Sequence, residues 1–312
     1  PATRFSINAD NIVRAPAVQP SDHGCFTKNE AKEEAKRCIM CRCDFCVKAC
    51  DLMQYYQKFP KLIEQEVHIT IYPGTLDGNG TVSTRLISTC NQCGLCAAAC
   101  PEDIDVGLFL RQSHIAMRNK GAMPWAFHEF WLRDMEHADS QRAAFSWTPK
   151  GAEKSRYLFF PGCQSGASNP DYVLKPYEFL LEKLPDTSIY LRCCGAPALW
   201  GGEEALYEKS RGEIRAKWEE LGRPTFVFSC ATCMEIFRQY LPEIRGVSLL
   251  EMLAEFGIAV PKDEAGKEVA VFDPCASRNF PAAQSAARAL VKQAGYEARP
   301  LTYEGKMARC CS

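Results

Sequence analysis

Cysteines in tight clusters are the residues of this sequence whose types and spacing could do chemistry. The chain of 312 residues contains 18 cysteines, and many stand only two or three residues apart. Such spacing suits a small inorganic centre better than pairing across a fold. Secreted disulfide scaffolds are usually short and thinly cored, whereas this chain is 46% hydrophobic. We therefore expect metal-bound thiolates and a reducing compartment.

The string "CNQCGLCAAACP", residues 90–101, is the most specific motif of the chain. It follows the C-x2-C-x2-C-x3-C-P run of bacterial ferredoxins, in which three thiolates bind one [4Fe–4S] cubane and the fourth binds another. Zinc is bound by four ligands in C-x2-C pairs and has no use for this run. The motif therefore predicts iron–sulfur clusters.

A second stretch, "RCIMCRCDFCVKAC" at residues 37–50, must supply the remaining ligands. The standard register is excluded because it needs a cysteine where Met40 stands. The alternative register uses Cys38, Cys41, Cys46 and Cys50. With "EAKRC" before it, this spacing resembles the N-terminal cluster segment of flavoproteins of the glutamate synthase small-subunit type, although Asp51 stands where a proline is expected.

The cross-ligation rule of two-cluster ferredoxins distributes these cysteines between two cubanes. The first cubane would be held by Cys38, Cys41, Cys46 and Cys100. The second would be held by Cys50, Cys90, Cys93 and Cys96. Cys25 and Cys43 are left over, and we expect both to be structural thiols.

Eight further cysteines lie in the second half of the chain: Cys163, Cys193, Cys194, Cys230, Cys233, Cys275, Cys310 and Cys311. Most follow a predicted strand, as in "YLFFPGC", "YLRCCG", "TFVFSC" and "VFDPC". Because parallel α/β sheets bring the carboxyl ends of their strands to one edge, these thiols can converge there. Helix N-termini at that edge would favour an anionic cluster, and Asp273 with Pro274 would supply one N-cap and first helical residue.

This pattern resembles the cysteine-rich CCG domain of heterodisulfide reductase catalytic subunits, whose relatives include iron–sulfur subunits that oxidise glycolate, lactate and glycerol-3-phosphate. A ferredoxin module before a CCG module is also similar to these proteins, so the resemblance covers about residues 27–312. It implies that a noncubane [4Fe–4S] cluster, which engages the substrate sulfur, is held by Cys163, Cys193, Cys194, Cys230 and Cys233. Cys275, Cys310 and Cys311 resemble a second copy with Ser312 in place of glycine and no trailing C-x2-C. Either this copy is truncated or its site is degenerate, and we expect truncation.

The elements that must position these cysteines form a predicted α+β and α/β architecture. An irregular extension, residues 1–24, precedes an α-helical ferredoxin-like two-cluster module at 25–120. A capping box at Thr27 and Glu30 should begin its first helix, and "VHITIYPGTLDGNGTVSTRLIST" predicts a β-hairpin insert. A helical connector and linker at 121–152 leads to two similar CCG halves, 153–261 and 262–312, with strands at "RYLFF", "SIYLR", "TFVFS" and "EVAVF" in a largely parallel sheet.

Charge and composition exclude several classes of function. The chain has 37 basic and 38 acidic residues, so its net charge does not favour binding to nucleic acid or to an anionic membrane surface. There is no run of 18 apolar residues, and no dinucleotide or nucleotide fingerprint follows a strand. We therefore expect a cytoplasmic protein, associated with a membrane only through a partner. The resemblance of residues 37–50 to the cluster segment of a flavoprotein implies a flavoprotein (FAD) subunit as a partner, with other redox subunits or a ferredoxin.

Two hypotheses follow for function. In the first, two cubanes pass electrons to a noncubane cluster that reduces a disulfide or oxidises thiols. In the second, the chain is an electron relay of a flavin-linked complex and has no substrate of its own. A zinc-stabilised interaction protein is a third class, and it predicts a colourless preparation.

Overall fold

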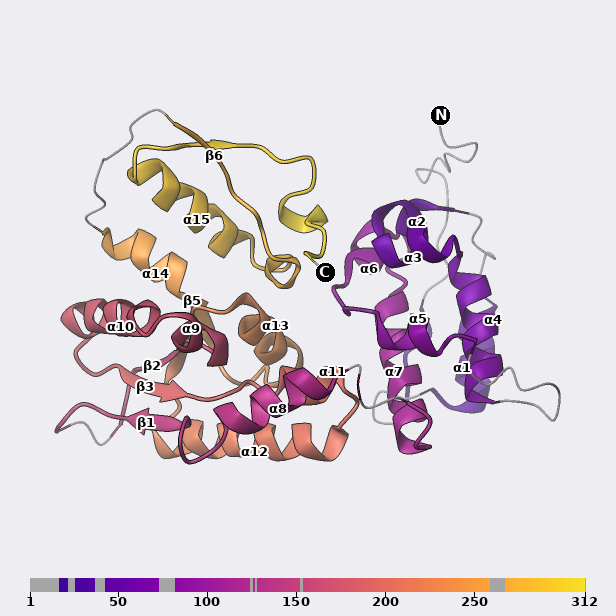
Figure 1. Ribbon diagram of the computed structural model, residues 1–312, viewed down its shortest axis with the longest axis horizontal. Helices are drawn as coiled ribbons and strands as arrows, with labels where there is room; N and C mark the ends of the chain where they lie inside the picture. The colour runs from indigo at the N-terminus through magenta and orange to yellow at the C-terminus, as the bar shows by residue number, and fades with distance from the viewer. Residues whose placement is uncertain are drawn as a thin grey trace.

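The computed structural model of the protein describes residues 17–21, 26–36, 43–72, 82–123, 126, 128–151, 154–258 and 267–311. Two lobes stand side by side, a helical lobe built from the N-terminal part of the chain and a larger α/β lobe built from the rest (Figure 1). The predicted mixture of helix and strand is confirmed.

The helical lobe contains seven helices among its described residues: α1 (Lys28–Ala35), α2 (Phe45–Ala49), α3 (Asp51–Tyr56), α4 (Pro60–Ile71), α5 (Thr84–Ser88), α6 (Leu95–Ala99) and α7 (Val106–Asn119). Helix α1 begins at the predicted capping box, in which the Thr27 hydroxyl accepts from the Glu30 N–H and the Glu30 carboxylate accepts from the Thr27 N–H. The described cysteines of this lobe lie between or within these short helices.

The β-hairpin predicted in this lobe is wrong. The segment that contains "VHITI" belongs to α4, and "TRLIS" forms α5. Pro60 occupies the first turn of α4, and Ile63, Val67 and Ile71 recur every four residues on its buried face. Burial of that helical face outweighs the strand propensity of its β-branched residues. Residues 73–81, the predicted turn, lie outside the described residues.

The α/β lobe is built on a five-stranded sheet of β1 (Phe145–Trp147), β2 (Tyr157–Phe160), β3 (Ser188–Leu191), β4 (Thr225–Phe228) and β5 (Gly246–Ser248). Its strand order is β1-β3-β2-β4-β5, with β2 parallel to β3 and β4, and β4 parallel to β5. The largely parallel sheet is therefore confirmed. β1 pairs antiparallel with β3, so part of the predicted helical connector and linker at 121–152 is an edge strand.

Helices cover both faces of this sheet: α8 (Glu129–Ala138), α9 (Cys163–Ser168), α10 (Asp171–Lys183), α11 (Ala196–Trp200), α12 (Glu204–Glu220), α13 (Ala231–Tyr240) and α14 (Leu249–Phe256). Alternate residues of β4 belong to different hydrophobic clusters, one on each face of the sheet. Phe226 and Phe228 pack on one face and Val227 packs on the other. On the first face, Phe160 and Phe237 join them in a fully buried aromatic group. This group lies directly under the cysteine-bearing strand ends.

The second half of the lobe repeats the beginning of the first on a smaller scale. It comprises β6 (Glu268–Ala270), η3 (Cys275–Ser277), α15 (Pro281–Gln293), β7 (Glu297–Arg299) and η4 (Gly305–Met307). β6 and β7 are parallel, as are β2 and β3, and a helix connects each pair. Figure 1 shows this half, in yellow, directed toward the helical lobe, where η4 packs near α6.

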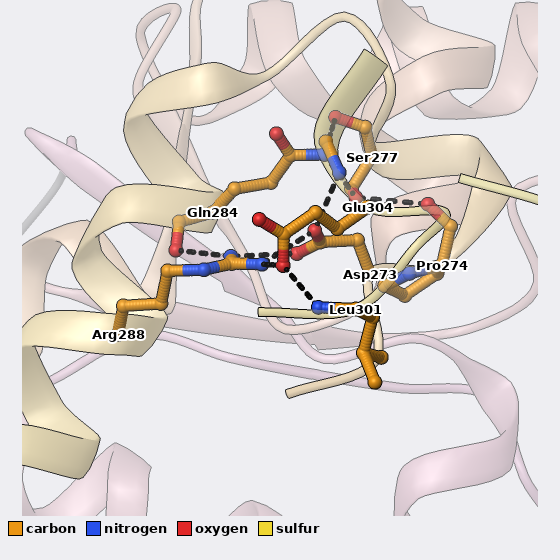
Figure 2. Close-up of polar contacts among 8 residues, drawn as sticks. Asp273, Pro274, Ser277, Gln284, Arg288, Leu301 and Glu304 are labelled. Carbon is orange, nitrogen blue, oxygen red and sulfur yellow. Dashed lines mark hydrogen bonds and ion pairs between the residues drawn. The ribbon is translucent and has the colours of Figure 1, made fainter. Parts of the chain in front are cut away.

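Asp273 organises this second half (Figure 2). Its carboxylate binds the guanidinium of Arg288 at 2.9 and 2.8 Å and accepts from the Gly305 N–H at 2.7 Å. Arg288 holds the pKa of Asp273 below its usual range, helped by the Gly305 N–H. The prediction of Asp273 as an N-cap is wrong, since Pro274 precedes η3 and the Asp273 side chain binds elsewhere.

Candidate iron–sulfur centres

Five cysteines of the α/β lobe meet at the carboxyl ends of three neighbouring strands. Cys163 begins α9 after β2, and Cys193 and Cys194 follow β3. Cys230 caps α13 after β4, and Cys233 lies in the first turn of that helix. Because β3, β2 and β4 are adjacent and parallel, their loops open on the same edge of the sheet. The topology therefore brings together residues that are up to 70 positions apart in the sequence.

The thiols of these residues touch one another in a continuous chain that runs Cys163, Cys193, Cys194, Cys233 and Cys230. We call this group the first cysteine site. Cys193, Cys194 and Cys233 are at most 4% exposed. All five residues predicted for this site are brought together.

Gly162 allows the strand ends to approach this closely. Its φ of +86° is a conformation that favours glycine, and a Cβ built on it would lie 3.1 Å from the Cβ of Cys230 and 3.4 Å from the Sγ of Cys233. The turn after β2 thus brings Cys163 beside the start of α13. Any larger residue would push the two loops apart.

Contacts between the thiols of the first cysteine site raise the pKa values of some and lower those of others. Hydrogen bonding to Cys193 and burial raise the pKa of Cys163. Contacts with Cys193 and then Cys233 lower the pKa of Cys194 to about 6. The pKa of Cys230 is also lowered to about 6, by Cys233 and by N–H groups of the first turn of α13. The site therefore stabilises thiolates, which are the metal-binding form, on Cys194 and Cys230.

Two charged residues that the sequence reasoning missed hold the Cys193–Cys194 loop. Asp139 accepts from the Cys193 N–H at 2.9 Å, and its other oxygen lies 3.0 Å from the guanidinium of Arg192. Arg192 is only 6% exposed and also pairs with Glu213 at 3.0 Å. The one available signal was a charged residue closing the apolar run "SIYLR". Asp139 lies in another segment and gave no signal.

In the helical lobe, the structure groups Cys50 with the thiols of the C-x2-C-x2-C motif. The Cys90 thiol interacts with those of Cys96, Cys93 and Cys50, and Cys93 also interacts with Cys50. We call these four residues the inner cysteine site. Gly94, at φ +71°, makes the turn that starts α6 between the second and third thiols. α2 and α6, which precede Cys50 and Cys100, pack against each other.

The other predicted set is described only in part. Cys46 interacts with Cys100 and with Cys43, whereas Cys38, Cys41 and Cys25 lie outside the described residues. In cross-ligation, the last cysteine of each motif binds the cluster of the other motif. The described thiols are arranged in this way, because Cys50 lies near Cys90 and Cys100 lies near Cys46.

Burial keeps several of these thiols protonated in the absence of metal. It raises the pKa of Cys90 to about 12 and those of Cys46 and Cys96 to about 11, with neighbouring thiols adding to the effect at Cys90 and Cys46. Metal binding must then displace protons, and it would replace an unfavourable buried charge with a bond.

The cysteines of the second half lie against the inner cysteine site. Cys275 and Cys310 contact each other, and both interact with Cys93. The Asn91 amide donates to the Cys310 sulfur at 3.1 Å. Cys311 is exposed. The carboxyl end of the second half therefore meets the helical lobe.

The donor sets suit iron–sulfur clusters. Each site presents thiols. Gly162 has no side chain, so the loop after β2 can lie close to Cys230 and Cys233. Among the residues that the structure describes, no three His, Cys, Asp or Glu side chains are arranged to hold a single metal ion.

Comparisons with known proteins identify both modules. Residues 23–105 match the family model described as a 4Fe-4S dicluster domain, and residues 157–238 match that of the CCG cysteine-rich domain. A relative from Methanothermobacter marburgensis, one of the subunits of its fumarate reductase (CoM/CoB), is 25% identical over 205 residues. That match covers 60% of this chain, which spans 40% of the relative's length.

No solved structure matches the chain. Over the described ranges, the helices are too short or too polar to cross a membrane. The two family matches and the cysteine geometry agree on the nature of the cofactors. The chain is an iron–sulfur protein, with a 4Fe-4S dicluster domain at residues 23–105 followed by a CCG cysteine-rich domain at 157–238.

Proposed function

We propose that this chain is a heterodisulfide reductase-like subunit whose first cysteine site acts on a disulfide or thiol substrate. The observation that carries the proposal is the convergence of five thiols on one sheet edge, two of which favour the thiolate form. A site built only to relay electrons needs four ligands for one cubane, so a fifth thiol indicates a different cluster. The five proposed ligands are Cys163, Cys193, Cys194, Cys230 and Cys233.

The proposed reaction is a two-electron step. Reduction of R–S–S–R′ breaks the S–S bond, takes up two electrons and two protons, and gives RSH and R′SH; thiol oxidation is the reverse. Bound clusters would supply one-electron redox chemistry. The chain's own groups would hold the thiolates in place, with Asp139 and Arg192 fixing the Cys193–Cys194 loop and Gly162 bringing Cys163 next to α13.

Two cubanes in the dicluster domain would exchange these electrons with a redox partner. We assign one to Cys38, Cys41, Cys46 and Cys100. We assign the other to the inner cysteine site, Cys50, Cys90, Cys93 and Cys96. Cys275, Cys310 and Cys311 would contribute to a second CCG cluster in a longer chain.

The electrons need a source outside this chain. The relative is named as one subunit of a reductase, which supports partner subunits here as well. An FAD-bearing subunit is the proposed neighbour, because it would convert two-electron donors into the single electrons that clusters carry. The proposed location is the cytoplasm, with any membrane contact made through a partner.

The test is anaerobic iron and acid-labile sulfide analysis, combined with electron paramagnetic resonance before and after a thiol is added to the oxidised protein. We expect about twelve irons and a thiol-induced signal. Cys194→Ser should abolish that signal and lower the iron content by about four irons per chain. Cys43 is outside the proposed ligand set, so Cys43→Ser should change neither the signal nor the iron content. About eight irons and no response to thiol would contradict the proposal and favour an electron relay that leaves the substrate to a partner.

A further inference from the structure

Arg278 joins the second CCG half to the dicluster domain. Its side chain is 7% exposed and donates to three backbone carbonyls, those of Cys93, Lys306 and Ala308. The distance from Nε to the Cys93 oxygen is 3.2 Å, and that from Nη2 to the Ala308 oxygen is 2.7 Å. One guanidinium thus ties η3 and the η4 segment of one lobe to the motif loop of the other.

The charge of Arg278 distinguishes it from the other buried guanidinium. Arg192 lies between the carboxylates of Asp139 and Glu213, which compensate its charge. Within the described ranges, the contacts of Arg278 are carbonyls and no carboxylate forms an ion pair with it. A buried cation without a counter-charge is unfavourable, so an anion beside it would be stabilised strongly.

The groups that Arg278 faces can become that anion. Its charge acts on the thiols of Cys93 and Cys275 and favours the thiolate of each. It opposes burial, which raises the pKa of Cys93, and the Cys310 contact and burial, which raise the pKa of Cys275. Cys93, Cys275, Cys310 and Arg278 all line a cavity of about 780 Å³ between the lobes. The cation therefore stands between the inner cysteine site and the cysteines of the second half.

We propose that Arg278 is a positioning residue that raises the reduction potential of the cubane at the inner cysteine site. The inference rests on the proposed assignment of a cubane to that site. Four thiolates give such a cluster a net negative charge. One-electron reduction makes that charge more negative by one unit. A nearby fixed cation stabilises the reduced form more than the oxidised form, so the midpoint potential rises. Arg278 would make this cubane more readily reduced than it would be without the charge.

The experiment is a redox titration of the whole chain, monitored by electron paramagnetic resonance, with iron content measured on each sample. Arg278→Gln removes the charge and Arg278→Lys keeps it. Arg278→Met is a second neutral variant that retains the aliphatic stem, and either neutral variant with full iron content decides the question. Arg238→Gln is the matched control, since Arg238 lines the same cavity but pairs with Glu235 at 2.7 Å.

In the neutral variants one cubane should shift to a more negative potential. At the wild-type midpoint, its ratio of reduced to oxidised cluster should fall about tenfold. Arg278→Lys should restore most of the wild-type potential, and Arg238→Gln should leave it unchanged. A neutral variant with full iron and an unshifted potential would overturn the inference while leaving the proposed cubane in place.

Loosening of the joint between the lobes is the competing explanation. Arg309→Gln tests it, because Arg309 contacts Asp51 and the Lys48 carbonyl across the same joint at 3.2 Å. If Arg309→Gln and Arg278→Lys lower the midpoint potential as much as Arg278→Gln and Arg278→Met do, then loosening of the joint explains the change and the inference is overturned. A wild-type protein without a cubane signal would overturn the proposed cluster assignment, and this inference with it.

Discussion

The carboxylate of Asp139 accepts the backbone N–H of Cys193 at 2.9 Å while its other oxygen meets the Arg192 guanidinium at 3.0 Å. Asp139→Ala should therefore leave a buried N–H and a buried cation partly unsatisfied. We expect a loss of about 1–3 kcal/mol in the free energy of unfolding, and weaker iron retention at the first cysteine site. Urea denaturation and iron analysis measure the two effects.

Glu213→Gln is the control for Asp139, because the Glu213 side chain pairs with the same Arg192 but is 49% exposed. Its loss should be within about 1 kcal/mol. Equal destabilisation by the two substitutions would show that the Cys193 contact contributes little.

Substitution of Gly162 should damage the first cysteine site specifically. Gly162 and Gly151 both have a positive φ, +86° and +88°. Alanine at either position is strained, by about 1–3 kcal/mol. Only at Gly162 would the new Cβ meet Cys230 and Cys233, since nothing lies within 4 Å of a Cβ at Gly151. Iron content should fall in Gly162→Ala and remain full in Gly151→Ala; a full complement in both would refute the close-approach argument.

Cross-ligation predicts a non-additive pattern of iron loss. If Cys50 and Cys93 hold the same cubane, then Cys50→Ser, Cys93→Ser and the double variant should each lack about four irons. If Cys46 holds the other proposed cubane, the variant with both Cys46→Ser and Cys93→Ser should lack about eight irons. Iron and sulfide analysis of anaerobically purified protein separates the two patterns. Additive loss for Cys50 with Cys93 would place them on different clusters.

His114 should make the protein less stable in mild acid. Its side chain is 2% exposed, its Nε2 has no partner among the described residues, and burial lowers its pKa to about 4, helped by His128 and Arg118. The unfolded chain binds this proton near pH 6.5, so the folded state loses stability as the pH falls from about 6.5 toward 4. Between pH 7 and 5 this amounts to about 2 kcal/mol.

His114→Leu should remove most of that pH dependence, as measured by urea denaturation at pH 7 and pH 5. His137→Gln is the control, since His137 is exposed on α8. A wild-type protein that is equally stable at both pH values would contradict the buried neutral state of His114.

The sheet and the first cysteine site could be predicted because their signals are local. Apolar runs such as "TFVFS" end directly in cysteine, and the parallel topology then determines where those ends meet. The segment "VHITI" misled the prediction because Ile and Val are common in strands, whereas the four-residue repeat that makes it a helix extends outside that string.

Other features had no local signal at all. Asp139 reaches Cys193 across 54 residues, and Arg278 reaches Cys93 across 185. Nothing near Asp139 or Arg278 in the sequence specifies these partners. Only packing of the lobes brings such charged groups to the backbone of the cysteine loops.

The joint made by Arg278 and Arg309 has a consequence for biosynthesis. These residues cover the motif loop and the end of α2, but they are synthesised 185 residues after Cys93 and 258 residues after Asp51. At roughly 5–20 residues per second, Cys93 precedes its cover by about 10–40 s. During that interval the motif loop is not yet covered by these two arginines. Late synthesis of the covering segment thus means that the joint between the lobes can close only after the whole chain has been made.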